Sequence, residues 1–334
     1  MVLRRIVSVP ALALLALALV VLSPVWIPAA ALWDCLRARW RWAHVRLLAF
    51  ATWWAWLETI GMLVAGWLLV TGRARDLGPH YRLQRWWANG LVVGLRRTCR
   101  LTLQARNLDV LVPGPVIVLP RHASLADALL SAWFVTRPGL EPRYVLKREL
   151  LLDPCLDIVG NRLRNHFLDR SAADAGPELA AIEVLAREVR DPDECIVIFP
   201  EGTRANPTKQ ARALARLAER SPERAARFAG LRHCNPPRPA GTLAVLAGAP
   251  EADVVLMAHA GFEGLDSFRG ILTAIPGTAP VLLDCERIPR AEVPTDPTDQ
   301  IAWLDAQWLR VDQRVDDLLR ERDALVAEAE RRHR

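Results

Sequence analysis

Two long apolar segments near the beginning of the chain most constrain what it can fold into. Residues 6–33 carry no charged side chain, and residues 47–70 carry one acid, Glu58. About 20 consecutive apolar residues in a helix cross the hydrocarbon core of a bilayer, so each segment is long enough to span it. A cleaved signal sequence is the alternative for the first segment, but that segment is too long and a second one follows almost at once. We therefore expect a membrane anchor here.

The charges and tryptophans around these segments indicate which kind of partner the chain binds. The formal net charge is +6, and residues 1–75, with eight arginines against two acids, account for all of it. The first 70 residues also hold 8 of the 13 tryptophans. Arginine and tryptophan beside apolar helices are typical of a bilayer interface. No aromatic-interleaved basic repeat and no zinc-finger spacing predicts nucleic-acid binding.

The arrangement of the anchor in the bilayer is less constrained, because arginines flank both segments on both sides. Pro24 and Pro28 can bend the first segment, which favours a shallow helical hairpin with both ends in the cytoplasm. Two full spans and a single span are the alternatives. We expect Glu58 to face a neighbouring helix or water rather than to take part in transport.

From about residue 76 onward, short apolar strands alternate with helical stretches. The predicted strands are 115–120, 143–146, 195–199 and 253–258, and the predicted helices are 124–135, 177–190 and 208–220. This alternation predicts an α/β fold with a mixed, mostly parallel sheet flanked by helices, preceded by the apolar helical hairpin.

The last part of the chain, residues 298–334, is charged but carries apolar residues at spacings of three and four. These are Ile301, Leu304, Trp308, Val311, Val315 and Leu318. The pattern predicts an amphipathic helix docked on the domain rather than a coiled coil, since only about two heptads are regular. The chain therefore divides into an anchor (1–75), an α/β domain (76–297) and a C-terminal helix (298–334).

The six cysteines are scattered singly along the chain, without a CxxC pair or the spacing of a disulfide framework. Reduced thiols and no structural disulfide are expected. No group of histidines and cysteines lies at metal-ligand spacing, so the sequence predicts no metal site.

The segment RHASLAD (121–127) follows directly on the predicted strand 115–120. It places His122 at the end of the strand and Asp127, after four intervening residues, on the first helical turn. A carboxylate that accepts one imidazole N–H leaves the other ring nitrogen as a free base. The alternative is an aspartate that only favours the helix start, beside an unrelated histidine. These two residues alone do not decide between a proton-handling pair and that alternative.

The segment IVIFPEGTR (196–204) reads as a strand followed by a turn that contains Glu201, Gly202, Thr203 and Arg204. A glycine after a strand lets main-chain N–H groups approach an anion, and an arginine side chain can bind a phosphate through two nitrogens. The turn therefore predicts a phosphate site, with a plain strand-to-loop connection as the alternative.

These segments, taken in order with HFLDR (166–170) and the apolar strand in VVLMAHAGF, resemble the glycerolipid acyltransferase family that includes 1-acylglycerol-3-phosphate acyltransferases. KREL (147–150) also fits this pattern, and the resemblance covers roughly residues 80–290. LRHCNPPRPAGTLAVL and the C-terminal tail look like the branch of lysocardiolipin and lysophosphatidylinositol acyltransferases. Two positions depart from the family: Arg121 replaces the usual Asn, and VVLMAHAGF lacks a proline.

The resemblance implies transfer of an acyl group from acyl-coenzyme A to the glycerol hydroxyl of a lysophospholipid, most simply 1-acylglycerol-3-phosphate, which gives phosphatidic acid. His122 would be the general base and Asp127 would orient it. Ser124 would cap the helix rather than act as a nucleophile, since it lies in no GxSxG turn. The implied substrate-binding residues are Lys147, Arg170, Glu201, Gly202, Thr203 and Arg204. No cofactor beyond the co-substrate acyl-coenzyme A is implied.

Other functions remain open from the sequence. The acceptor can be another lysophospholipid or a glycolipid, the donor can be acyl carrier protein, and the oligomeric state is not indicated. A silent membrane scaffold has no reason to keep both His122 and Asp127, and no nucleophile elbow supports a lipid hydrolase. Two lysines against 41 arginines are typical of a GC-rich bacterial genome, so we expect the bacterial inner membrane, with the catalytic domain facing the cytoplasm.

Overall fold

The computed structural model of the chain describes residues 2–37, 41–124, 126–169, 174–265 and 267–332. The chain forms two compact units, each built from separate stretches of sequence. The first comprises Met1–Thr102, Leu146–Phe167 and Phe268–Thr278, and the second Leu103–Val145, Leu168–Ser267 and Ala279–Arg334.

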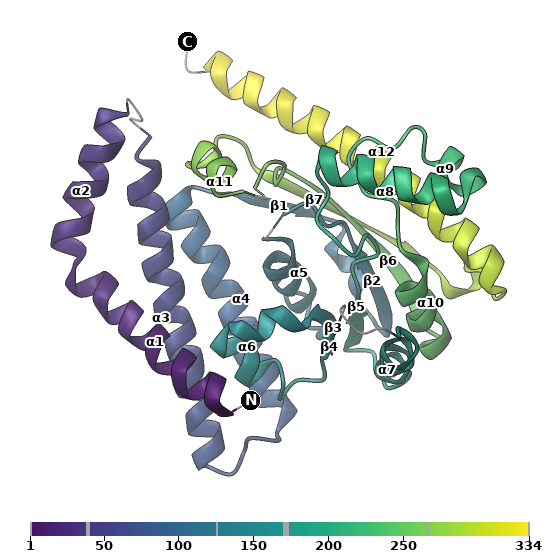
Figure 1. The fold of residues 1–334 in the computed structure, drawn as a ribbon, viewed down its shortest axis with the longest axis horizontal. Helices are drawn as coiled ribbons and strands as arrows, with labels where there is room; N and C mark the ends of the chain where they lie inside the picture. The colour runs from purple at the N-terminus through teal and green to yellow at the C-terminus, as the bar shows by residue number, and fades with distance from the viewer. Residues whose placement is uncertain (1, 38–40, 125, 170–173, 266, 333–334) are drawn as a thin grey trace. The chain divides into compact units, whose positions relative to one another are not determined.

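Helices make up most of the first unit. They are α1 (Val2–Val21), α2 (Ser23–Leu36), α3 (Ala43–Val70), α4 (Leu77–Cys99), α6 (Pro154–Val159) and α11 (Phe268–Ala274). The first apolar segment breaks at Leu22, and Pro24 follows within the first turn of α2, where its missing N–H leaves no helical hydrogen bond unmade. The bend that the prolines predicted is therefore present. Helix α3 lies alongside α1, α2 and α4 (Figure 1).

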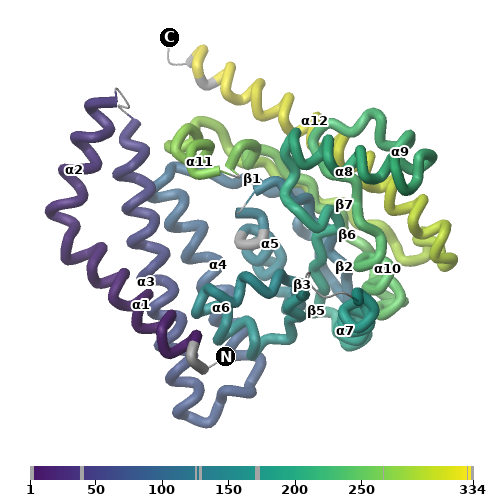
Figure 2. The backbone as a smooth tube through the Cα atoms, in the orientation of Figure 1, coloured from purple at the N-terminus to yellow at the C-terminus, as the bar shows by residue number. Residues whose placement is uncertain are grey.

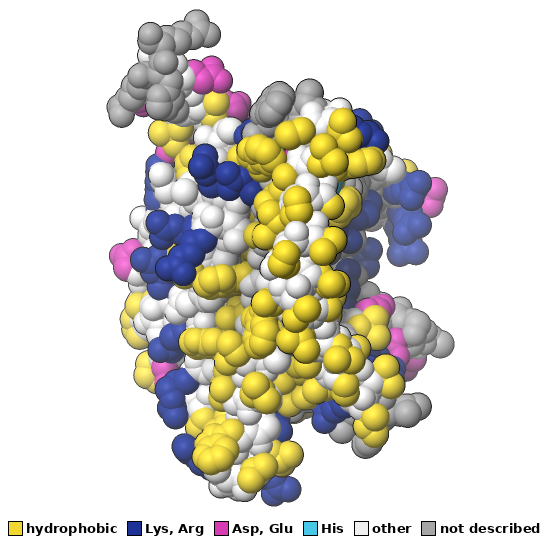
Figure 3. All heavy atoms as spheres, turned by 90° about the vertical axis from the view of Figure 1, so that its left-hand side faces the viewer, with side chains coloured by type: hydrophobic (Ala, Val, Ile, Leu, Met, Phe, Trp, Pro, Cys, Tyr) yellow, Lys and Arg dark blue, Asp and Glu magenta, His cyan; other side chains and the backbone are white. Residues whose placement is uncertain are grey.

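Two segments of this unit, Arg4–Val21 in α1 and Ala43–Val70 in α3, are long and apolar enough to cross a membrane by length and composition. Large hydrophobic side chains are exposed along α1, α2 and α3, among them Ile6, Leu14, Val21, Val25, Leu32, Leu63, Trp67 and Val70. Figure 3 views the molecule from the side of these helices and shows hydrophobic side chains over much of their length. Such a continuous apolar surface is unusual for a protein surrounded by water.

Buried acids hold the helices of the first unit together. Trp87 of α4 donates a hydrogen bond from Nε1 to Glu58 Oε1 in α3 at 2.6 Å, so Glu58 faces a neighbouring helix as expected. Arg4 and Arg5 at the start of α1 form ion pairs with the fully buried Asp157 of α6, at 2.6 and 2.9 Å. A buried carboxylate is stable only when it is paired in this way, so Asp157 fixes the beginning of α1.

The second unit contains most of a seven-stranded sheet in the order β1-β7-β6-β2-β5-β3-β4. The strands are β1 (Leu103–Arg106), β2 (Val116–Pro120), β3 (Glu141–Lys147), β4 (His166–Leu168), β5 (Glu194–Val197), β6 (Asp253–Ala260) and β7 (Val281–Ile288). The pairs β1–β7, β2–β5, β2–β6 and β3–β5 are parallel, whereas β6 and β7 are antiparallel. The expected mixed, mostly parallel sheet is confirmed.

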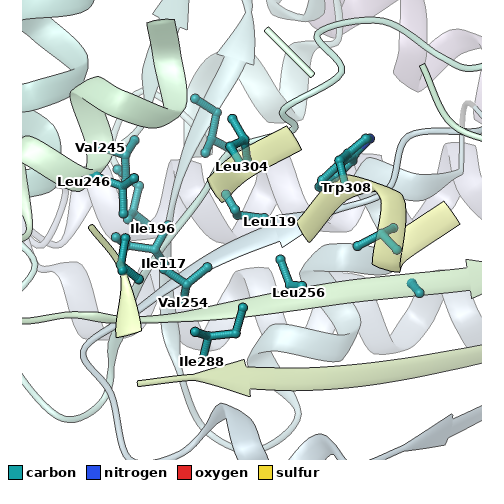
Figure 4. Packing of buried hydrophobic residues seen from close by; sticks show 14 of the residues in the cluster. Ile117, Leu119, Ile196, Val245, Leu246, Val254, Leu256, Ile288, Leu304 and Trp308 are labelled. Carbon is teal, nitrogen blue, oxygen red and sulfur yellow. The ribbon is translucent and has the colours of Figure 1, made fainter. Parts of the chain in front are cut away.

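Helices flank this sheet on both faces. Five are α5 (Asp127–Thr136), α7 (Gly176–Arg187), α8 (Pro207–Arg220), α9 (Pro222–Arg227) and α10 (Pro239–Gly248), and α12 (Pro297–Arg332) ends the chain. Alternate strand residues such as Ile117 and Leu119 share one hydrophobic core with α7, α10 and α12 (Figure 4). Tyr144 in β3 points the other way and contacts Ser131 of α5, at 3.3 Å between the two hydroxyls.

Helix α12 is the docked amphipathic helix that the apolar spacing predicted. Leu304, Trp308, Val311, Val315 and Leu318 are buried in the same core. Helix α9 lies beside α12 (Figure 2), and Arg224 of α9 binds Asp305 of α12 through two nitrogens. The C-terminal helix is therefore part of the second unit rather than an appendage.

Candidate active site

The carboxyl ends of two neighbouring parallel strands bring the candidate residues together. The chain leaves β2 into the loop with His122 and leaves β5 into the loop with Glu201, and ligands of open α/β sheets collect at such an edge. Ala205 N donates a hydrogen bond to the main-chain oxygen of His122 at 2.6 Å, which ties the two loops together.

His122 and Asp127 form a hydrogen-bonded pair. His122 Nδ1 lies 3.1 Å from Asp127 Oδ2. The Asp127 side chain is 1% exposed, whereas that of His122 is 14% exposed and lies against the Phe199 ring. An ionised carboxylate accepts the Nδ1 proton, so Nε2 carries a lone pair and can act as a base.

The carboxylate of Asp127 is held by the loop that precedes it. Oδ2 also accepts hydrogen bonds from the main-chain N–H groups of Ala123 and Ser124, and Oδ1 accepts one from Ser124 Oγ at 2.6 Å. Burial opposes ionisation of Asp127, but the facing His259 ring favours it. The hydrogen bonds from His122 and Ser124 favour it further, so the pKa of this carboxyl lies below its ordinary value.

Ser124 has a different place from the one expected. Helix α5 begins at Asp127, and Ala126, whose side chain makes no capping bond, holds the position before it. Ser124 Oγ instead donates to Asp127 and accepts from Ala126 N. The expectation of a helix cap was wrong, because the early turn allows this hydroxyl to reach the carboxylate directly.

Glu201 binds the main chain on both sides of the site. Its Oε1 accepts from His122 N and its Oε2 from Asn235 N, each at 2.7 Å. Full burial raises the pKa of Glu201 to about 8, although both hydrogen bonds and the nearby Arg121 favour the charged form. Glu201 therefore determines where the main chain of His122 lies.

Arg121 and His259 form a buried layer behind the pair. Arg121 Nη1 donates to His259 O and to Glu263 Oε1, both at 2.7 Å. His259 Nε2 lies 3.2 Å from Arg121 O and 3.5 Å from Asp127 Oδ1. Burial lowers the pKa of His259, and its Nε2 donates to Arg121 O, since a carbonyl oxygen only accepts.

The segment after β5 forms the turn that its sequence predicted, with Gly202 in a conformation that favours glycine. Gly202 has a φ of +65°, which other residues adopt only with strain, and a Cβ there would lie 3.0 Å from Arg238 Cδ. Its N–H donates to Phe199 O, and Thr203 O accepts from Asn235 Nδ2 at 3.1 Å. Within the described part of the chain, the half-buried Arg204 side chain has no hydrogen-bond or ion-pair partner.

Two other residues, Lys147 and Arg170, were predicted to bind the substrate. Lys147 is the last residue of β3 and belongs to the first unit. Arg170 lies outside the residues that the structure describes.

A loop held by the C-terminal helix completes the site. Asp312 of α12 accepts hydrogen bonds from three successive main-chain N–H groups, those of Arg232, His233 and Cys234, at 2.7–2.9 Å. Asn235 comes next in the chain and binds Glu201. Helix α12 is therefore connected to His122 through the loop 232–235 and the hydrogen bonds of Asp312 and Glu201.

The sequence motifs did not predict four residues of this site: His259, Glu263, Asn235 and Asp312. His259 and Glu263 lie in or just after the strand that lacks the usual proline, and Asn235 lies in the distinctive segment LRHCNPP. Asp312 gave no signal beyond its place on the polar side of an amphipathic helix. Among the described residues, no group of three or more His, Cys, Asp or Glu side chains could hold a metal ion.

Comparison with known families identifies this part of the chain. Residues 102–228 match the acyltransferase family. They form an acyltransferase domain. The family resemblance drawn from the motifs is thereby confirmed, while its branch stays a prediction.

The fold of the acyltransferase domain and its flanking helices is also similar to a solved structure. The crystal structure of the 1-acyl-sn-glycerophosphate (LPA) acyltransferase, PlsC, from Thermotoga maritima matches with a TM-score of 0.51. The two chains are 16% identical, and the match covers 83% of this chain and 97% of the other. At this identity the likeness concerns the fold alone. No curated protein matches the chain significantly.

Proposed function

We propose that this protein is a membrane-bound acyltransferase that moves a fatty acyl group from acyl-coenzyme A to the free glycerol hydroxyl of a lysophospholipid. The most direct acceptor is 1-acylglycerol-3-phosphate, which gives phosphatidic acid. The observation that carries the proposal is the contact of His122 Nδ1 with the buried Asp127 carboxylate at 3.1 Å, which leaves Nε2 as a base in the acyltransferase domain.

In this reaction His122 Nε2 removes the proton from the acceptor hydroxyl as its oxygen attacks the thioester carbonyl. The tetrahedral intermediate then expels the coenzyme A thiolate, which takes the proton back from His122. Asp127 holds the tautomer throughout and stabilises the imidazolium. General-base catalysis contributes roughly 10² to 10⁴ in rate, and orientation of the two bound substrates supplies the rest.

The turn after β5 is the proposed site for the acceptor's phosphate and glycerol. Arg204 has a guanidinium without a described protein partner, and such a group forms strong paired bonds to phosphate. Gly202 and Thr203 shape the turn. Glu201 acts on the acceptor site through the main chain of His122, and we keep Arg170 and Lys147 as further candidates for substrate binding.

Membrane attachment is supported by the exposed apolar surface of α1–α3 and by the two helices long enough to span. A lipid acceptor resides in the bilayer, so an anchored enzyme reaches it without extracting it into water. We propose the bacterial inner membrane, with the catalytic domain on the cytoplasmic side, where acyl-coenzyme A is made.

The test is an assay of detergent-purified protein with labelled acyl-coenzyme A and a panel of acceptors. The panel contains 1-acylglycerol-3-phosphate, lysophosphatidylglycerol, lysophosphatidylinositol, lysocardiolipin and glycerol 3-phosphate, with His122→Ala as the matched inactive protein. We expect the labelled acyl chain on 1-acylglycerol-3-phosphate above all. Preference for another lysophospholipid would change only the proposed acceptor. Release of free fatty acid without any acylated product would contradict the proposed acyl transfer.

A further inference from the structure

A cluster of arginines in the first unit, away from the candidate active site in the sequence, surrounds a cleft. Arg41, Arg46 and Arg100 line it together with Trp42 and the turn 276–278, and its volume is about 530 Å³. None of the described residues that line the cleft is acidic.

Two of these arginines, Arg41 and Arg46, are held in place by main-chain oxygens rather than by acids. Arg41 Nη2 donates to Pro276 O at 2.6 Å. Arg46 donates from Nε to Arg41 O at 3.0 Å and from Nη1 to Thr98 O at 2.9 Å. Carbonyl oxygens fix the direction of a guanidinium but leave its full charge uncompensated.

Like charges therefore face one another across this cleft. Arg100 acts on Arg46 through its positive charge, and within the described residues no carboxylate pairs with either of them. Two neighbouring guanidinium groups without a counter-charge repel each other, and a bound anion relieves that repulsion.

The beginning of α3 does not account for an anion site by itself. Asp34 already accepts from the first-turn N–H groups of His44 and Val45, and its other oxygen contacts His44 Nδ1 at 2.6 Å. The positive end of this helix is thus already occupied by a carboxylate. The attraction for an additional anion comes from the arginine side chains.

The position of the cleft suggests where its ligand comes from. Arg41 and Trp42 lie in the connection between α2 and α3, at one end of the apolar helices. Arginine and tryptophan at the end of an apolar helix are typical of the level of lipid headgroups.

We propose that this cleft binds the phosphate group of an anionic ligand, supplied either by an anionic phospholipid headgroup or by free phosphate. The guanidinium groups of Arg41, Arg46 and Arg100 hold the phosphate oxygens. The site is separate from the proposed acceptor site at Arg204 and does not depend on the proposed reaction.

The experiment is titration calorimetry on the full-length protein in a nonionic detergent. The probes are inorganic phosphate, dihexanoylphosphatidylglycerol and, as a zwitterionic control, dihexanoylphosphatidylcholine. Arg100→Gln is compared with Arg96→Gln, which removes an equal charge from an exposed position in the last turn of the same helix α4. Arg100→Lys keeps the charge. Every titration is repeated with Arg204→Ala, which weakens the proposed substrate site.

We expect Arg100→Gln to weaken binding of phosphatidylglycerol or phosphate by about tenfold or more, since a bond to a charged group is lost. Arg96→Gln should stay close to the unchanged protein, Arg100→Lys should be intermediate, and the effect should persist in Arg204→Ala. Tighter binding of phosphatidylglycerol than of inorganic phosphate identifies a lipid ligand, and equal binding identifies free phosphate. The proposal is overturned if Arg100→Gln binds both probes unchanged, if Arg96→Gln loses as much, or if Arg204→Ala alone removes all phosphate binding.

Discussion

The carboxylate of Glu201 accepts a hydrogen bond from the main-chain N–H of His122, with 2.7 Å between Glu201 Oε1 and His122 N. Its second oxygen binds Asn235 N, and the three residues before Asn235 bind Asp312 of α12. The imidazole of His122 is thus oriented by Asp127, while its main chain is positioned from the far end of the sequence. Residues remote from the substrate are therefore expected to affect turnover.

The first prediction concerns Asp312→Asn. An amide accepts through one atom only, so at least one of the three main-chain hydrogen bonds is lost, and the N–H group that made it faces the new NH₂ group. We expect a loss of about 1–3 kcal/mol in the free energy of unfolding. We also expect kcat to fall roughly tenfold to a hundredfold, with a smaller change in KM, because the base is displaced.

Asp317→Asn is the control for this variant. The Asp317 side chain is 45% exposed on the same helix, and its ion pair with Arg320 is long, at 3.8 Å. Its replacement should change stability by less than about 0.5 kcal/mol and leave kcat unaltered. Equal kinetics for the two variants would show that α12 does not position His122.

The second prediction is a pH dependence of stability that originates in Glu201. Burial raises the pKa of this carboxyl from 4.5 to about 8 in the folded protein. Between these values the unfolded chain releases the proton that the folded protein keeps. The contribution of Glu201 to stability is therefore complete below about pH 4.5 and is lost as the pH rises through about 8.

Melting temperatures of the unchanged protein and Glu201→Gln, taken from pH 5 to pH 9, measure this contribution. The glutamine cannot titrate. As the pH rises to about 8, the melting temperature of the unchanged protein should therefore fall relative to that of Glu201→Gln, and above about pH 8 the difference should stay constant. Parallel profiles over the whole range would mean that Glu201 titrates like an ordinary acid.

Much of the sheet and its central pair could be predicted because local sequence encodes them. The apolar strands β2, β3, β5 and β6 stand out from their surroundings, and RHASLAD places a histidine and an aspartate on one loop. The edge strand β1 and its neighbour β7 were not predicted, because their apolar residues are interspersed with polar ones, such as Gln104 and Glu286. The hydrogen bonds of Asp312 and His259 join distant stretches of chain, and only the folded structure reveals them.

The third prediction concerns the phosphate of the acceptor. Arg204→Ala should raise the KM for a phosphate-bearing acceptor by the equivalent of roughly 1–3 kcal/mol, and should affect the KM for acyl-coenzyme A less. Arg216→Ala is the control, since this arginine is exposed on the neighbouring helix α8. An equal rise for both substrates would instead assign Arg204 to the phosphates of the coenzyme.

The fourth prediction concerns the anchor. If α1 and α3 insert into the bilayer, the protein should remain in the membrane pellet after washing with alkaline carbonate and with salt. A salt concentration on the order of 1 M screens the attraction between arginines and anionic lipid headgroups. Insertion of two apolar helices is effectively irreversible, whereas surface attachment through arginines is screened. Release of most of the protein by salt alone would show that the helices only lie on the lipid.

The last prediction separates the two roles that an aspartate at a helix start can have. Asp127→Asn keeps the shape of the side chain, but its amide can donate to the imidazole and favour the wrong tautomer of His122. We expect kcat to fall by about 10² to 10⁴ with little change in KM. Stability should fall as well, by about 1–3 kcal/mol, since Ala123 N, Ser124 N and Ser124 Oγ share the same carboxylate.

Asp299→Asn is the matched control, because Asp299 is an exposed acid in the first turn of α12 and only favours the helix dipole. It should lose about 0.3–1 kcal/mol of stability and keep full turnover. His122→Ala should abolish transfer and leave the melting temperature almost unchanged, since its ring contributes little to the core. The measurements are kcat, KM and melting temperature for all three variants. Substantial acyl transfer by a folded His122→Ala protein would exclude His122 as the base, and normal turnover by Asp127→Asn would reduce Asp127 to a helix-start residue.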